Sequence, residues 1–262
     1  MSLDPSATTT ALLGLAAFLA GWIDAVVGGG GLVQLPSLLV AFPQASPVTL
    51  LAANKLASIC GTSVSAATYL RRIRPDRATA VPLVLAAFAG SIVGALLASR
   101  IPLSAFRPMI LVVLVGVGAY TLLRPELGRH TQLRFAGRRH LGATMLVGVG
   151  AGLYDGALGP GTGSFLVFAL VGWSGYAFLQ ATAKAKLANA ATNLAALLVF
   201  TAQGVVPWRL GLLMGAANVA GGYLGARTAI ARGSGFVRTV FVLVVVGFVI
   251  RIGWDVLAQL FG

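Results

Sequence analysis

The chain has 262 residues, of which 58% are hydrophobic and only 10% are charged, and its formal net charge is +13 at pH 7. Soluble domains carry about 25% charged residues, so this composition excludes a water-soluble globule and predicts an integral membrane protein. The arginines stand in short clusters between apolar runs, as in the basic loops of membrane proteins, so we expect no nucleic-acid partner.

Apolar segments follow one another along the whole chain. In the first half we expect helices over residues 10–27, 32–42, 48–70, 78–99 and 106–123. In the second half we expect helices over residues 141–158, 163–173, 177–203, 208–231 and 236–257. Most of them reach the roughly 20 residues that cross about 30 Å of hydrocarbon, whereas 32–42 and 163–173 are short enough to be half-helices. The predicted fold class is an all-α polytopic membrane protein.

The chain repeats itself at an offset of 131 residues (155 − 24 = 131), half of its length. The residues that recur at this offset form the pairs Asp24/Asp155, Gly28/Gly159, Gly30/Gly161, Lys55/Lys186, Gly90/Gly221, Gly94/Gly225 and Gly116/Gly247. This gap-free register predicts two related bundles. We expect residues 1–123 to form the first transmembrane repeat, 124–140 a cytoplasmic linker and 141–262 the second repeat.

Positive charge predicts how the repeats are oriented. The arginine clusters at 71–77 and 124–140 are assigned to the cytoplasm by the positive-inside rule, whereas the start of the chain carries no positive charge. The two halves therefore begin on opposite sides of the membrane. This predicts two inverted repeats of about five helical segments each, with both termini outside. Eight spans in a four-plus-four repeat are the alternative.

Two glycine-rich breaks interrupt the apolar runs just before the short segments. Glycine and proline at these positions cannot continue a helix cheaply, and freed backbone N–H groups inside a membrane need partners. Each following half-helix would point its positive N-terminus at the same place, which favours anion binding over tight turns alone. The candidate substrate-binding residues in the breaks are Gly28, Gly29, Gly30, Gly31, Gly159, Gly161, Thr162 and Gly163.

The three lysines of the chain, Lys55, Lys184 and Lys186, all fall within long apolar segments. An ammonium group in lipid is costly and usually marks a pathway or a paired site, although a lysine near a helix end can also extend its side chain to the interface. Lys184 has no lysine counterpart in the first half, so it fits better the alternative of a lysine that reaches the interface. The candidate polar neighbours of the lysines are Asn54, Ser58, Thr62, Asn189 and Asn193.

Asp24 and Asp155 are the matched acids of the apolar segments. They could neutralise the lysines, cap the broken helices, or carry a proton that couples transport; we favour a structural ion pair or cap. His130 and His140 belong to the polar linker and are expected to be solvated. No catalytic triad, metal constellation or cofactor motif is recognised, so we predict neither an enzyme nor a bound metal or cofactor.

Three stretches resemble the TauE/SafE (sulfite exporter) family of membrane permeases: GWIDAVVGGGGLVQLPSLL (21–39), AANKLASICGTSVSAATYLRR (52–72) and GLYDGALGPGTGSFLVFAL (152–170). The continuation ATAKAKLANAATNLAALLVF (181–200) is similar to the family's second repeat. The resemblance implies a multi-pass transporter of a bacterial or archaeal inner membrane that moves sulfur-containing anions such as sulfite, thiosulfate or organosulfonates.

Residues and resemblance together predict a secondary transporter that exports a small sulfur-containing anion by alternating access. An anion channel and a carrier of a non-sulfur carboxylate are the alternatives. The expected partners are the anion, membrane lipid and a coupling proton or cation.

Overall fold

The computed structural model describes residues 5–98 and 130–261, and the predicted segment 106–123 lies outside these residues. Within the described residues the elements are all helices, which confirms the all-α fold class. They are α1 (Ala7–Val27), α2 (Gly31–Ala41), α3 (Pro47–Arg72), α4 (Arg77–Leu97), α6 (Gly137–Ala157), α7 (Thr162–Gly172), α8 (Phe178–Ala202) and α9 (Trp208–Phe261). The helix α6 begins inside the stretch that we assigned to the linker.

Local sequence signals explain where these helices begin and end. Ser46 and Asp76 cap α3 and α4 by accepting hydrogen bonds from backbone N–H groups of Thr49 and Thr79. Gly28 ends α1 in a left-handed conformation with φ of 88°. Gly233, with φ of 74°, divides α9 into two arms, where we expected two separate helices. Among the described helices, α1, α4 and α8 are long and apolar enough to cross a membrane, and α2 and α7 are shorter apolar helices of 11 residues each.

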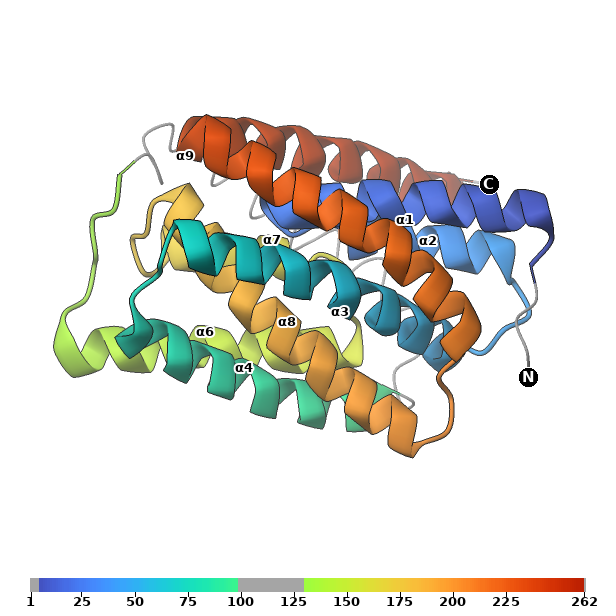
Figure 1. The fold of residues 1–262 in the computed structure, drawn as a ribbon, viewed down its shortest axis with the longest axis horizontal. Helices are drawn as coiled ribbons and strands as arrows, with labels where there is room; N and C mark the ends of the chain where they lie inside the picture. The colour runs from blue at the N-terminus through green and yellow to red at the C-terminus, as the bar shows by residue number, and fades with distance from the viewer. Residues whose placement is uncertain (1–4, 99–129, 262) are drawn as a thin grey trace.

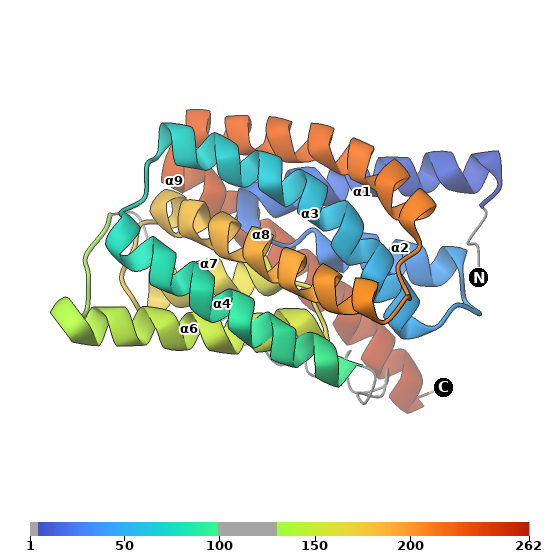
Figure 2. The same ribbon diagram turned by 60° about the horizontal axis from the view of Figure 1, so that its bottom comes forward.

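Two helical hairpins enter the bundle from opposite ends (Figures 1 and 2). The hairpin of α1 and α2 starts at the end where α9 finishes, turns near the middle of the bundle, and returns. The hairpin of α6 and α7 starts at the other end and does the same. The long helices α3, α4 and α8 and both arms of α9 run the length of the bundle beside them. The turns of the two hairpins therefore lie in its interior.

Most arginines of the described residues lie at one end of this bundle. We call it the basic end; it comprises the link from α3 to α4 (residues 71–77), the start of α6 and the kink region of α9 (residues 227–238) (Figure 1). The start of α1 and the end of α9 lie at the opposite end.

Close packing of glycines joins the two halves of the chain. A Cβ atom on each of four glycines would lie within 3.0 Å of a backbone oxygen of the facing helix: Gly90 at Val149, Gly94 at Leu153, Gly221 at Phe18 and Gly225 at Trp22. The residues that face these glycines are separated by the same 131 positions as the glycines (149 − 18 = 131 and 153 − 22 = 131). Thus α4 packs on α6 just as the first arm of α9 packs on α1.

A pair of glycines on α6 provides a test of this packing. A Cβ atom on Gly152 would overlap the backbone oxygen of Ala87 in α4, whereas one on Gly150 would meet nothing within 4 Å. We expect Gly152→Ala to lower the free energy of unfolding in detergent by about 1–3 kcal/mol, because α4 and α6 must move apart. Gly150→Ala serves as the control and should leave the thermal midpoint unchanged or raise it slightly. Equal midpoints for the two variants would contradict the packing.

Candidate functional site

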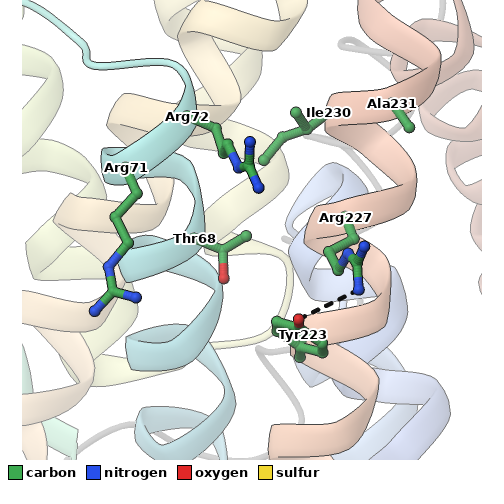
Figure 3. A pocket seen from close by; sticks show the side chains of 7 residues that line it. All are labelled: Thr68, Arg71, Arg72, Tyr223, Arg227, Ile230 and Ala231. Atoms are coloured by element: carbon green, nitrogen blue, oxygen red, sulfur yellow. Dashed lines mark hydrogen bonds between the residues drawn. The ribbon is translucent and has the colours of Figure 1, made fainter.

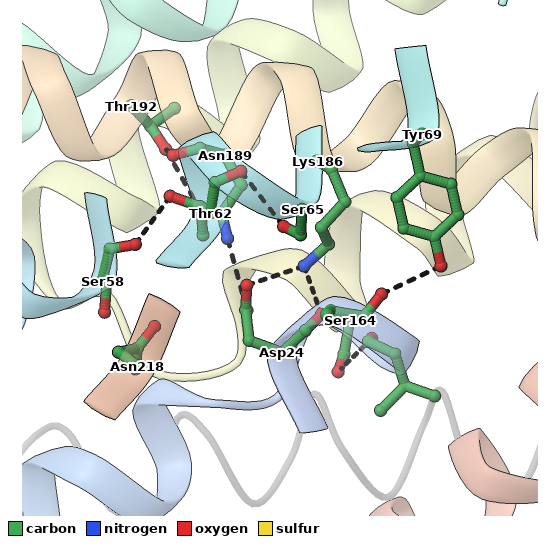
Figure 4. Close-up of polar contacts among 12 residues, drawn as sticks. Asp24, Ser58, Thr62, Ser65, Tyr69, Ser164, Lys186, Asn189, Thr192 and Asn218 are labelled. Carbon is green, nitrogen blue, oxygen red and sulfur yellow. Dashed lines mark hydrogen bonds and ion pairs between the residues drawn. The ribbon is translucent and has the colours of Figure 1, made fainter. Parts of the chain in front are cut away.

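The two glycine-rich breaks meet at the centre of the bundle. The backbone N–H of Ser164 donates to the carbonyl oxygen of Gly28 at 3.1 Å. The side-chain hydroxyl of Ser164, seen in Figure 4, donates to Val27 O at 3.0 Å. A Cβ atom on Gly28 would overlap the backbone of Gly163, so the hairpins approach at a distance that only glycine permits. Gly159 and Gly161 also adopt left-handed conformations, with φ of 88° and 83°.

Two buried ion pairs cross between the halves beside these breaks. Lys55 Nζ lies 2.7 Å from Asp155 Oδ2, and Lys186 Nζ lies 2.8 Å from Asp24 Oδ2. Each lysine thus pairs with the aspartate of the other half, and the two pairs are related by the offset of 131 residues. Taking charges out of water is costly, and the opposite charge and further hydrogen bonds offset that cost.

The two pairs differ in how closely they are shielded. The side chains of Lys55 and Asp155 are only 1% and 2% exposed, whereas Asp24, the partner of Lys186, is 13% exposed. Asp24 also accepts a hydrogen bond from the Asn189 amide at 3.4 Å, and its backbone oxygen accepts one from Lys186 Nζ (Figure 4). The pair at Asp24 is therefore the more accessible of the two.

A small polar cavity lies between the breaks and the ion pairs. The volume of this cavity is ≈ 10 Å³, about the space of one water. Every residue that lines it was named as a candidate from the sequence: Asp24, Gly28, Gly31, Asn54, Lys55, Ser58, Asp155, Gly159, Gly161, Thr162, Gly163, Asn189 and Asn193. The structure thus brings these candidates together around one cavity.

Several cavity groups have donors or acceptors to offer a ligand. The N–H groups of Gly161 and Gly163, at the start of α7, have no acceptor within the described residues. The buried side chain of Asn54 likewise leaves its Oδ1 without a partner there. Cation, helix N-terminus and amide together form an environment that suits a small anion.

Five other candidates do not line the cavity. Lys186 is one of them, although its Nζ contacts the lining residue Asp24. Gly29 and Gly30 belong to the turn of the first hairpin, and a Cβ atom on Gly30 would overlap Ala20 O of α1. The Thr62 hydroxyl donates to the carbonyl oxygen of Ser58 at 2.7 Å within α3. Lys184 lies apart, in a second polar cluster at the basic end.

This second cluster gathers around Lys184. Its Nζ lies 2.5 Å from Asp76 Oδ2, donates to the hydroxyl of Thr79, and lies 4.7 Å from the ring centre of Tyr176. Partial burial alone would raise the pKa of Asp76, but hydrogen bonds from Lys184 and Thr79 hold it below its ordinary value. Lys184 is fully buried, so its side chain does not extend into the interface as a free lysine would.

The prediction that His140 is solvated is wrong. His140 is 5% exposed, and its Nε2 lies 2.7 Å from the Tyr176 hydroxyl. The reason is that α6 begins at Gly137, which carries His140 into the bundle. His130 is exposed, as expected.

Other polar residues of the site were not anticipated. Gln34 is fully buried: it donates to Asn54 O at 3.2 Å and accepts from the Asn218 amide at 2.9 Å. The Tyr154 hydroxyl donates to Pro160 O at 2.7 Å, bracing the second break. In the sequence, the sign of such residues was a polar side chain, such as that of Gln34, that stands alone in an otherwise apolar segment.

Among the described residues, no group of three or more His, Cys, Asp or Glu side chains could hold a metal ion.

Apolar helices, two opposed hairpins with broken turns, and buried ion pairs where the turns meet define a polytopic membrane transport protein. The chain matches the family described as Sulfite exporter TauE/SafE over residues 13–252, and it belongs to that family. The resemblance seen in the sequence is thereby confirmed, and the family is one of transporters rather than enzymes.

Curated relatives from bacteria carry the same class of name. The chain is 37% identical over 230 residues to the probable membrane transporter protein YfcA of Escherichia coli K12, covering 87% of this chain and 83% of the relative. It is 34% identical over 242 residues to the probable membrane transporter protein ORF9 of Sinorhizobium sp, covering 92% and 91%. A probable membrane transporter protein of Haemophilus influenzae is 34% identical over 234 residues, covering 89% and 90%. No solved structure matches the chain.

Proposed function

We propose that this protein is a secondary transporter that exports a small sulfur-containing anion by alternating access of two inverted repeats. The observation that carries the proposal is the pair of crossed lysine–aspartate contacts beside the broken helices. Two ammonium groups held at the junction of the halves supply charge for an anion, and the carboxylates keep these groups neutralised when no anion is bound.

The ion pairs suggest how binding and coupling are linked. An anion that approaches Lys186 competes with the carboxylate of Asp24 for the same ammonium group. Protonation of Asp24, or its pairing with another cation, releases the lysine to the anion. Because Asp24 is the more exposed of the two acids, we assign the coupling step to it and a structural role to Asp155.

The opposed hairpins support alternating access. The cavity lies where their turns meet, so a movement of α1 and α2 would open a route toward one end of the bundle, and a movement of α6 and α7 toward the other. The glycine contacts recur at the repeat offset, as expected for a transporter whose two related halves move against each other. A cavity of ≈ 10 Å³, about the space of one water, favours a carrier over an open channel.

The positive-inside rule orients the proposed transporter. It places the basic end in the cytoplasm and both chain termini outside. The names of the bacterial relatives support location in a membrane, and we propose the inner membrane of a bacterium from the family resemblance.

The substrate class rests on the family description and on the donors of the cavity. Oxygens of sulfite, thiosulfate or a sulfonate can each accept a hydrogen bond from an ammonium, an amide or a backbone N–H group. A carrier of a non-sulfur carboxylate would use the same donors, so it is the second candidate.

A ligand screen tests the substrate class. We expect sulfite, thiosulfate or a sulfonate to raise the unfolding temperature of the detergent-purified protein. At a ligand concentration of one hundred times the dissociation constant, the free energy of unfolding should rise by about 2.7 kcal/mol. The same anions should show saturable flux in proteoliposomes. Stabilisation by carboxylates alone would overturn the sulfur class, and flux that does not saturate would favour a channel.

A further inference from the structure

A second, larger hollow lies at the basic end, outside the central site. Its volume is ≈ 400 Å³, and it is formed by the end of α3 and the first arm of α9. Figure 3 shows Arg72 of α3 and Arg227 of α9 on facing sides of it, with Thr68 below Arg72 on α3 and Tyr223 below Arg227 on α9. Arg71 also belongs to the lining and extends on the outer side of α3.

The arginines of this hollow have no carboxylate to neutralise them within the described residues. Asp24, Asp76 and Asp155 are each paired with a lysine elsewhere. Asp255 belongs to the last turns of α9, at the opposite end of the bundle. Two guanidinium groups that face one space repel each other, and an anion between them would remove that repulsion. The hollow therefore has the electrostatic character of an anion site.

The geometry of the walls adds specificity to this charge. Arg227 Nη1 donates to the Tyr223 hydroxyl at 3.3 Å, and its guanidinium lies 5.6 Å from the ring centre, so the ring supports the arginine. The planar fork of arginine matches the oxygens of a phosphate group. Thr68 adds a further hydroxyl on the α3 side.

The surroundings of the hollow indicate a lipid rather than a dissolved ion. Leu70, two residues before Arg72, is 46% exposed, and Leu224, next to Tyr223, is 47% exposed. In a membrane these leucines face acyl chains, whereas the arginines lie at the helix ends at headgroup depth. Basic pockets between transmembrane helices on the cytoplasmic side are where acidic headgroups bind.

We propose that this hollow binds the phosphate of an anionic phospholipid whose acyl chains lie along α3 and α9. The lipid bridges two helices that both serve the central site: α3 carries Lys55, and α9 carries Asn218, the partner of Gln34. Headgroup binding therefore holds these helices together at the basic end.

Native mass spectrometry tests the proposal on the delipidated, detergent-purified protein. We expect palmitoyl-oleoyl phosphatidylglycerol to bind more tightly than palmitoyl-oleoyl phosphatidylcholine. Each of Arg72→Gln and Arg227→Gln should weaken phosphatidylglycerol binding about tenfold, as expected for loss of a charged hydrogen bond. Arg72→Lys should give an intermediate affinity, because it keeps the charge but not the fork.

Matched controls separate this hollow from general positive charge. Arg77→Gln and Arg232→Gln remove the same charge at the basic end outside the lining and should leave phosphatidylglycerol binding unchanged. Tyr223→Phe keeps the aromatic ring and the net charge but removes the hydroxyl. It should weaken phosphatidylglycerol binding modestly. Equal losses in the control variants, or no preference over phosphatidylcholine, would overturn the proposal. Displacement of the lipid by millimolar inorganic phosphate would instead assign the hollow to a dissolved anion.

Discussion

Replacing Lys186 by alanine is expected to abolish saturable anion flux in proteoliposomes while leaving the protein folded in detergent. The variant removes the ammonium group that the proposed substrate shares with Asp24. Loss of one partner of a buried charge pair weakens binding by about 2–5 kcal/mol, which corresponds to at least about thirtyfold in affinity. Because Asp24 is 13% exposed and keeps its contact with Asn189, the uncompensated carboxylate should be tolerated.

Lys184 provides the matched control, since it lies two residues away on the same helix. Its partner Asp76 is 52% exposed and remains solvated after Lys184→Ala. We therefore expect that variant to retain saturable flux, with only a small loss of stability. Normal flux in Lys186→Ala would remove Lys186 from the transport site, and loss of flux in Lys184→Ala alone would move the site to the basic end.

Replacing Lys55 by alanine should instead compromise the fold. It leaves the Asp155 carboxylate, 2% exposed, without its ammonium partner, and such a change costs about 3–5 kcal/mol. We expect a large drop in the thermal midpoint of the detergent-solubilised protein and poor recovery from the membrane.

The double variant Lys55→Ala with Asp155→Ala completes a mutant cycle. Removing both charges eliminates the unpaired carboxylate, so the double variant should be more stable than Lys55→Ala alone. Recovery of stability without recovery of flux would mean that the pair is both a structural link and part of the site. Additive destabilisation would show that the contact between the two residues contributes nothing.

Sequence reasoning named the residues that the structure brings together around the central cavity, but not the partner of each residue. The offset of 131 residues identified the lysines, the aspartates and both glycine breaks before any contact was known. It could not predict that each lysine pairs with the acid of the opposite half, because that pairing depends on how the hairpins enter the bundle. Helical spacing places residues on one face of their own helix and says nothing of which helix lies opposite.

The position of Lys184 was, in part, open to sequence reasoning. Residues two apart on an α-helix are turned by about 200° from each other, so Lys184 and Lys186 could not both face one cavity. His140 was missed for a different reason. Its helix begins with Gly137, Arg138 and Arg139, residues that suggest a loop, and nothing in the sequence indicated that His140 would contact Tyr176.

The crossed pairing has a consequence for biosynthesis. When Lys55 leaves the ribosome, its counter-ion still lies 100 residues downstream (155 − 55 = 100). At about 5–20 residues per second, that delay lasts about 5–20 s. During this interval neither Lys55 nor Asp24 of the nascent first half has its native partner, so a truncated product ending before Asp155 should be held by the insertion machinery or degraded rather than settle in the bilayer.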